Sequence, residues 1–138
     1  MSTSIRSEIS KKNKYWIERH RYYELKHFCL QYLLWKKAYS MLDGISKTTN
    51  DVVTSKTNTY SSPTEKCAIE KLYYSERMEM VEKAAKETDE SLSSYILRGV
   101  TEGVSYDYLK ARLNIPCCKD TYYELYRRFF WILSKMRK

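Results

Sequence analysis

Glycine and proline are scarce in this chain, with 3 and 2 residues among 138. A turn-rich all-β fold needs more of both, so the composition favours helices. No apolar run approaches the roughly 18–20 residues that a membrane span requires. The N-terminal stretch MSTSIRSEISKKNK also lacks the apolar core of a secretory signal. We therefore expect an all-α protein of the cytoplasm that has no membrane partner.

The usual catalytic and metal-binding motifs are missing as well. The sequence contains no P-loop, no glycine-rich phosphate-binding loop and no C-x-x-C pair. Its four cysteines, which we expect to be reduced thiols, are Cys29, Cys67, Cys117 and Cys118. His20 and His27 lie roughly 10 Å apart along a helix, which is too far for one metal ion. We expect no metal, no cofactor and no enzymatic activity.

Positive charge is the feature in excess, with a formal net charge of +8. Residues 1–47 carry 10 basic and 4 acidic side chains, and residues 105–138 carry 8 and 3. Residues 48–104 reverse the balance with 7 and 10. Two basic ends around an acidic middle indicate a polyanionic partner such as nucleic acid. The alternative is a solvated basic surface with no ligand.

The N-terminal part predicts one long helix. From Tyr15 to Leu42 the sequence has neither glycine nor proline, and Asp43-Gly44 is a common helix stop. At about 100° per residue, one apolar stripe comprises Ile17, Leu25, Phe28, Cys29, Tyr32, Trp35, Tyr39 and Leu42. A second stripe on the far side comprises Trp16, Tyr23, Leu30, Leu34 and Met41. A helix with two apolar sides is expected to be buried on both.

Trp131 adds to the evidence for a partner, because an exposed tryptophan often marks an interface. Together with four members of the second stripe it forms the predicted partner interface, which comprises Trp16, Tyr23, Leu30, Leu34 and Trp131. The partner would be a second copy of the chain or another protein. The alternative is that the first helix packs over Trp131 inside one subunit.

Composition divides the chain into an N-terminal helix (1–45), a linker rich in Ser, Thr and Asn (46–62) and a helical domain (63–138). The run Ser62-Pro63-Thr64-Glu65 predicts a helix start, with Ser62 as cap and Pro63 in the first turn. We expect this helix to end near Lys86 or Glu87. Its predicted inner face comprises Ile69, Leu72, Tyr73, Met80, Val81 and Ala84.

The last third of the chain predicts three more helices. The first is capped by Thr88 or Asp89, turns Leu92, Tyr95 and Ile96 inward, and ends between Gly99 and Gly103. Ser105 then caps a short helix, and Asn114-Ile115-Pro116 breaks it; Asn114 tolerates a positive φ. The final helix runs from Lys119 with an inner stripe of Tyr122, Tyr126, Phe129, Phe130, Leu133 and Met136. A short helix, a turn and a long basic-aromatic helix are the order of a helix-turn-helix, at about residues 105–137.

The segment GVSYDYLKARLNIPCCKDTYYELYRRFF, preceded by ILRGV, resembles the C-terminal part of RinA/ArpU-type late transcription regulators of Gram-positive phages and prophages. The C-terminal half of those regulators is similar to the fourth region of sigma factors. The resemblance covers about the last third of the chain. It implies binding to double-stranded DNA near phage promoters, with host RNA polymerase or another host protein as a further partner.

The predicted DNA-binding residues are Lys110, Arg112, Lys119, Tyr123, Arg127 and Arg128. We expect Lys119, Tyr123 and Arg127 to lie nearest the groove. Arg128, together with Lys110 or Arg112, is expected to contact phosphates. The alternative is that the arginines only flank a core helix and face solvent. Asp120 and Glu124 on the same helix weaken the case for DNA contact, because carboxylates repel phosphate. A rival function is an anti-CRISPR-type inhibitor of phage or mobile-element origin, which blocks a host nucleic-acid machine through protein contacts.

Overall fold

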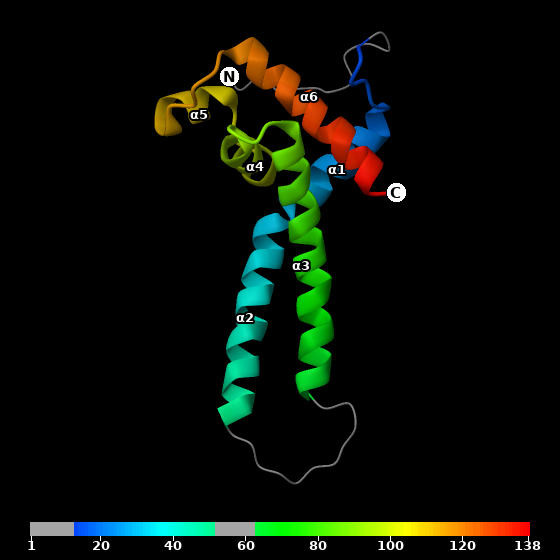
Figure 1. The fold of residues 1–138 in the computed structure, drawn as a ribbon, viewed down its shortest axis with the longest axis vertical. Helices are drawn as coiled ribbons and strands as arrows, with labels where there is room; N and C mark the ends of the chain where they lie inside the picture. The colour runs from blue at the N-terminus through cyan, green and yellow to red at the C-terminus, as the bar shows by residue number, and fades with distance from the viewer. Residues whose placement is uncertain (1–12, 52–62) are drawn as a thin grey trace.

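A computed structural model describes residues 13–51 and 63–138 (Figure 1). These residues form six helices: α1 (Arg19–Leu30), α2 (Tyr32–Asp51), α3 (Pro63–Thr88), α4 (Ser93–Glu102), α5 (Tyr106–Leu113) and α6 (Lys119–Met136). The described residues include no strand, which confirms the all-α class. Figure 1 shows α2 and α3 side by side as an arm, with α1, α4, α5 and α6 gathered at one end. We call residues 32–51 and 63–78 the stalk, and residues 13–31 and 79–138 the head.

The head is built around the buried side of α6. Its fully buried Tyr122, Phe129, Phe130 and Leu133 meet residues from α1, α3 and α4 in one core that includes Tyr22, Leu25, Val81, Ala84 and Ile96. The rings of Tyr22 and Phe130 lie edge to face at 5.2 Å, and the Tyr22 and Tyr126 hydroxyls share a hydrogen bond of 2.9 Å. Each large side chain contributes about 1.5–3 kcal/mol through its burial. The inner stripe predicted for the last helix is therefore confirmed at its central positions.

The stalk is an antiparallel pair of helices with a narrow seam. The seam residues follow spacings of three and four, as in a coiled coil. They are Tyr32, Trp35, Tyr39 and Leu42 on α2, and Cys67, Lys71, Tyr74 and Met78 on α3. Cys67 Sγ donates to the Leu42 carbonyl oxygen at 3.2 Å, and Lys71 Nζ lies 2.8 Å from Asp43 Oδ1. Nearer the head, the Tyr32 hydroxyl donates to the Glu82 carboxylate.

The N-terminal helix differs from its prediction at both ends and in the middle. It begins at Arg19 rather than Tyr15, and the Glu18 carboxylate caps it by accepting the N–H groups of His20 and Arg21. It breaks at Gln31, whose N–H bonds three residues back to the Phe28 carbonyl. This tighter bond ends α1 and lets α2 leave in a new direction.

The predicted stop at Asp43-Gly44 is also wrong, because α2 continues to Asp51. Residues 46–51 are thus helical, although the composition placed them in a linker. The rest of that predicted linker, residues 52–62, lies outside the described residues. A helix packed along α3 retains its hydrogen bonds through a glycine whose cost is about 1 kcal/mol.

The predicted inner face of α3 is partly wrong. Val81 and Ala84 are buried as expected, but Ile69, Leu72 and Tyr73 are exposed. The true seam uses Lys71 and Tyr74, whose long side chains cover apolar surface while their polar ends reach the edge. Hydrophobicity alone therefore selected the wrong side of the helix.

The predicted starts of two helices are confirmed. Pro63 is the first residue of α3, and Lys119 is the first residue of α6. The predicted cap of the third helix by Thr88 or Asp89 is wrong, because α4 begins at Ser93 with Leu92 at the cap position and no side-chain cap. Asp89 Oδ1 instead accepts the N–H of Leu92 at 3.1 Å in the preceding turn. Among the helices of the described residues, none is long and apolar enough to cross a membrane.

Candidate nucleic-acid interface

Helix α5 is short because its two ends are closely defined. Ser105 Oγ accepts the N–H of Tyr108 at 3.2 Å, which caps the start. Asn114 ends the helix in the left-handed region with φ 53°, as the sequence predicted. The N–H of the buried Ile115 then bonds back to the Leu109 carbonyl at 3.2 Å. These contacts hold α5 at a set angle to the chain that follows.

The turn at residues 114–118 is tied to α5 at its far end. The Tyr106 hydroxyl donates to the Cys117 carbonyl oxygen at 2.6 Å, and the Tyr106 ring lies 5.8 Å from that of Tyr122 on α6. Tyr106 thus links the beginning of α5, the turn and the first buried residue of α6. The orientation of α6 relative to α5 follows from this link.

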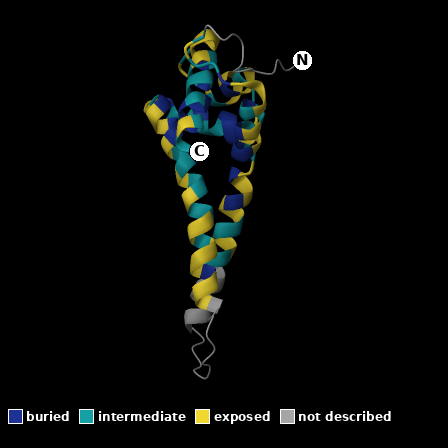
Figure 2. Ribbon diagram, turned by 90° about the vertical axis from the view of Figure 1, so that its right-hand side faces the viewer, coloured by how far each residue is buried: buried dark blue, intermediate teal, exposed yellow. Residues whose placement is uncertain are grey.

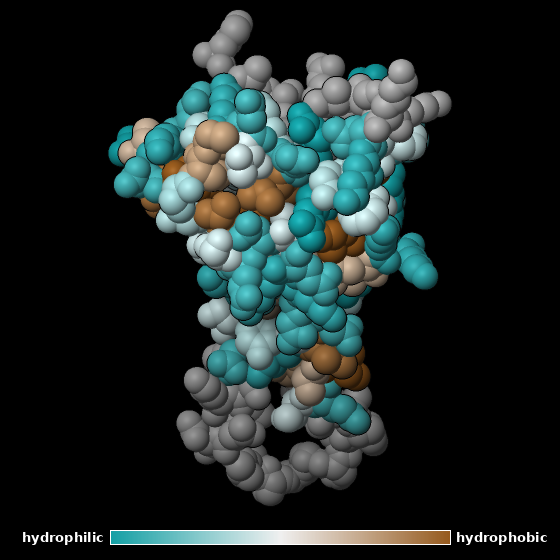
Figure 3. Space-filling view, turned by 45° about the horizontal axis from the view of Figure 1, so that its top comes forward, coloured by the Kyte–Doolittle hydropathy of each residue, from teal (hydrophilic) through white to brown (hydrophobic). Residues whose placement is uncertain are grey.

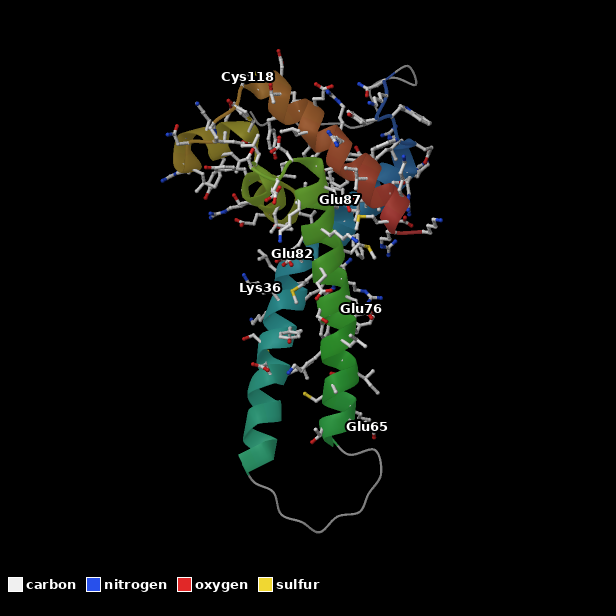
Figure 4. The ribbon with its side chains drawn as sticks, viewed as in Figure 1. Lys36, Glu65, Glu76, Glu82, Glu87 and Cys118 are labelled. Atoms are coloured by element: carbon white, nitrogen blue, oxygen red, sulfur yellow. The ribbon has the colours of Figure 1, made fainter. Side chains whose placement is uncertain are left out.

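Helix α6 begins at Lys119, and Cys118 stands just before it at the cap position; Figure 4 shows Cys118 at this end of the helix. Cys118 occupies the cap position but its side chain bonds no backbone N–H, and its Sγ lies 3.1 Å from Thr121 Oγ1. This hydrogen bond lowers the pKa of the Cys118 thiol. The first N–H groups of a helix attract negatively charged groups. The N-terminal end of α6 is therefore suited to an anion such as phosphate.

Three of the predicted DNA-binding side chains lie on α5 and at the start of α6. Lys110 and Arg112 of α5 and Lys119 of α6 are all exposed. Burial raises the pKa of the Cys117 thiol, and the positive charge of Lys110 opposes that rise, which places Lys110 near the turn. Lys119 Nζ lies 5.7 Å from the centre of the half-buried Tyr123 ring. The structure thus brings Lys119 to Tyr123 and places Lys110 near Cys117 of the turn.

The two arginines are in a different environment. Arg127 and Arg128 are both half-buried, and Arg127 Nε is buried without a hydrogen-bond partner among the described residues. Arg128 lies near Asp89, whose pKa is lowered mainly by the hydrogen bond from Ser91 and also by this guanidinium. Their stems therefore contribute to packing as well as to charge.

The electrostatics of this end of the head are mixed. Exposed Asp107, Asp120 and Glu124 stand among the exposed Lys110, Arg112 and Lys119. Carboxylates repel phosphate but accept hydrogen bonds from the amino group of cytosine. Binding here would depend on individual contacts rather than on a uniform positive field.

The predicted partner interface is largely covered within the subunit. The ring of Tyr15, just before α1, lies 5.3 Å from that of Trp131, and Lys135 Nζ lies 3.4 Å from the Trp131 ring centre. Leu30 packs near Gly103, where an added methyl group would lie 3.5 Å from its Cδ2. Trp16 and Tyr23 are half-buried, whereas Leu34 is 66% exposed. The expected burial of the second stripe on α2 is therefore not met within one subunit.

Two contacts have no local signal in the sequence. Arg21 of α1 donates to the carbonyl oxygens of Ser134 and Arg137 and so caps the C-terminus of α6. Tyr122 on α6 sits directly against Gly99 on α4. Both join residues far apart in the chain, and no local pattern marks either pair.

The described residues contain no group of three or more His, Cys, Asp or Glu side chains that could hold a metal ion. Comparison with known proteins found no matching family model, no similar curated protein and no similar solved structure.

Proposed function

We propose that this chain binds double-stranded DNA through α5 and the first half of α6, as a phage- or prophage-encoded transcription regulator in the cytoplasm of a bacterial host. One observation carries the proposal. Exposed Lys119 in the first turn of α6 follows the turn whose Cys117 lies near Lys110, and Arg112 is exposed on the same short helix as Lys110, while the opposite side of α6 is buried in the core. The resemblance to RinA/ArpU-type regulators supports the same assignment.

The arrangement suits a major groove, which is about 12 Å wide and admits a helix. Lys119 and the N–H groups of the first turn of α6 contact phosphate. Lys110 and Arg112 hold the flanking strand. Tyr123 and Arg127 reach base edges, and Glu124 accepts from a cytosine amino group. Burial of the opposite side of α6 fixes the helix before DNA arrives, so little ordering entropy is lost on binding.

The test is fluorescence anisotropy of a labelled random-sequence duplex at two salt concentrations. The wild type is compared with Arg112→Ala/Lys119→Ala and with the control Lys83→Ala/Lys86→Ala, which removes the same charge from exposed positions on α3. We expect wild-type dissociation constants of about 10⁻⁴–10⁻⁶ M near physiological salt. The site variant should reduce the salt slope by about 1.8, since each phosphate contact contributes about 0.9. The control should keep the wild-type slope.

Two outcomes would overturn the proposal. Absence of binding at low salt would remove DNA as the ligand. It would favour the rival function, a host-directed inhibitor acting through protein contacts, for which the exposed apolar residues of the stalk would be the surface. An equal slope in the site variant and the control would move the DNA site elsewhere, with the exposed Arg19 and half-buried Lys26 of α1 as the next candidates.

A further inference from the structure

A cavity of about 390 Å³ lies where the stalk meets the head, outside the seam between α2 and α3. It is formed by residues of α1, of the middle of α3 and of the segment that follows α6. Figure 2 views the molecule from the side on which the chain ends in Figure 1. The lining residues are Phe28, Glu76, Arg77, Met80, Arg137 and Lys138. The volume is within the range of about 300–1,000 Å³ that is usual for small-molecule sites.

Two of the lining side chains are apolar. Phe28 is 5% exposed and belongs to the core of the head, and the half-buried Met80 packs against that core. On the face drawn in Figure 3 the exterior is mainly hydrophilic, with hydrophobic side chains gathered in a few patches. An aromatic ring on α1 and a flexible thioether on α3 together cover apolar groups of different shapes. The cavity therefore has room for the apolar part of a ligand.

The charged lining residues carry an excess of positive charge. Arg77, Arg137 and Lys138 are cations and Glu76 is the single carboxylate, so positive charges outnumber negative ones by two. Arg77 lies 3.4 Å from the centre of the Tyr73 ring and donates one hydrogen bond to the Tyr73 carbonyl at 3.0 Å. Among the described residues neither Arg77 nor Lys138 forms an ion pair. Most N–H donors of the Arg77 guanidinium therefore remain for a ligand.

Arg137 is held in position before any ligand arrives. Its guanidinium lies 4.2 Å from the centre of the Phe28 ring, and its carbonyl oxygen accepts a hydrogen bond from Arg21. Its ion pair within the described residues is with Glu24, at 3.8 Å, and Arg21 binds the same carboxylate more closely. A cation placed in advance loses little entropy on binding. Arg137 thus adds a preformed anion contact to the cavity.

We propose that this cavity binds a small organic phosphate, namely a phosphate monoester with an apolar or aromatic organic part. Such a monoester carries about two negative charges near neutral pH, which matches the excess of two positive charges. Guanidinium groups suit phosphate because their N–H groups bind two oxygens at once. A carboxylate brings one charge and would neutralise only half of the excess. The organic part would contact Phe28 and Met80.

The first test follows the methyl signals of labelled methionines by NMR while phenyl phosphate is added to the full chain without nucleic acid. The Met80 signal is assigned by its loss in Met80→Leu. It should shift with saturation, while Met41, which is 61% exposed on the stalk, should not shift. Phenol lacks the charge and inorganic phosphate lacks the ring, so each should bind at least about tenfold more weakly. Benzoate, with one negative charge, should also bind more weakly than phenyl phosphate.

The second test removes the cations one at a time. Arg77→Gln and Lys138→Gln should each weaken phenyl phosphate binding about tenfold, because each removes a charged contact to phosphate. Lys138 is exposed beyond the end of α6, so its replacement should leave the fold intact, as circular dichroism will verify. Lys86→Gln is the matched control, because Lys86 is an exposed cation of α3 that does not line this cavity. It should bind phenyl phosphate as the wild type does.

Four outcomes would each overturn the proposal. They are an unchanged Met80 signal at millimolar phenyl phosphate, equal affinity for phenyl phosphate and inorganic phosphate, tighter binding of benzoate, and equal weakening by Lys138→Gln and Lys86→Gln. Because no DNA is present in either test, failure of this binding site is distinct from failure of the proposed function.

Discussion

Replacing Gly99 with alanine tests how closely α4 and α6 pack. A methyl group added at Gly99 would lie 2.1 Å from Tyr122 Oη and 3.3 Å from Tyr122 Cζ. Tyr122 is fully buried, so its ring has little room to retreat. Overpacking of this kind costs about 1–3 kcal/mol, while alanine regains roughly 0.5–1 kcal/mol over glycine in a helix. We expect Gly99→Ala to lower the free energy of unfolding by about 1–2 kcal/mol.

Tyr122→Phe supplies the second arm of a double-mutant cycle. The Tyr122 hydroxyl is buried and has no hydrogen-bond partner among the described residues. Removing an unpaired buried hydroxyl removes a desolvation penalty, so this variant alone should be about 1 kcal/mol more stable. In that background the closest contact to an alanine methyl group disappears. Gly99→Ala should then be nearly neutral, with a coupling of about 1–2 kcal/mol between the sites.

Urea unfolding followed by circular dichroism gives all four free energies. Gly103→Ala is the comparison, since its cost comes from a backbone φ of 69° and should be the same with tyrosine or phenylalanine at position 122. If Gly99→Ala costs the same in both backgrounds, Tyr122 does not limit the approach of α4 to α6.

Three further predictions concern the loops and thiols of the head. Asp89→Ala should lower the free energy of unfolding by about 1 kcal/mol near neutral pH and by progressively less in acid. Hydrogen bonding from Ser91 lowers the pKa of Asp89, so the stabilisation that the carboxylate provides is lost as the pH falls through that lowered pKa. Urea unfolding at several pH values checks this, with Asp89→Asn as the uncharged control. Asn114→Ala should lower the melting temperature by adding about 1–2 kcal/mol of left-handed strain, and Asn114→Gly should not. Cys118 should react with iodoacetamide before the other cysteines in mass spectrometry, because it is exposed and its pKa is lowered by Thr121; equal rates for all four thiols would contradict the described burial.

The sequence predicted features that depend on neighbouring residues and missed those that depend on distant ones. The Ser105 cap and the positive φ of Asn114 follow from local hydrogen bonding and sterics, and both are confirmed. The continuation of α2 past Gly44 depends on α3 lying alongside. No local rule supplies that neighbour.

The side of α3 that faces α2 also depends on distant residues. Ile69 and Leu72 outrank Lys71 and Tyr74 in hydrophobicity, yet the less apolar pair faces the seam. Lys71 is placed there by Asp43 and by the Tyr39 ring, 5.3 Å from its Nζ, on the other helix. At the candidate site, helical periodicity could predict that Lys110, Arg112 and Lys119 are exposed. The half-burial of Arg127 and Arg128 depends on how α6 sits in the head.

The capping of α6 by Arg21 has a consequence for the time at which the protein folds. Arg21 and its acceptor Arg137 are separated by 116 residues, and the apolar side of α1 packs on the same helix. During synthesis α1 is made before α6 and is not covered by it until α2 to α5 have also been made. Contacts of such long range make the head a slow and late assembly. A truncation before α6 would therefore leave α1 without its partner and expose the core of the head.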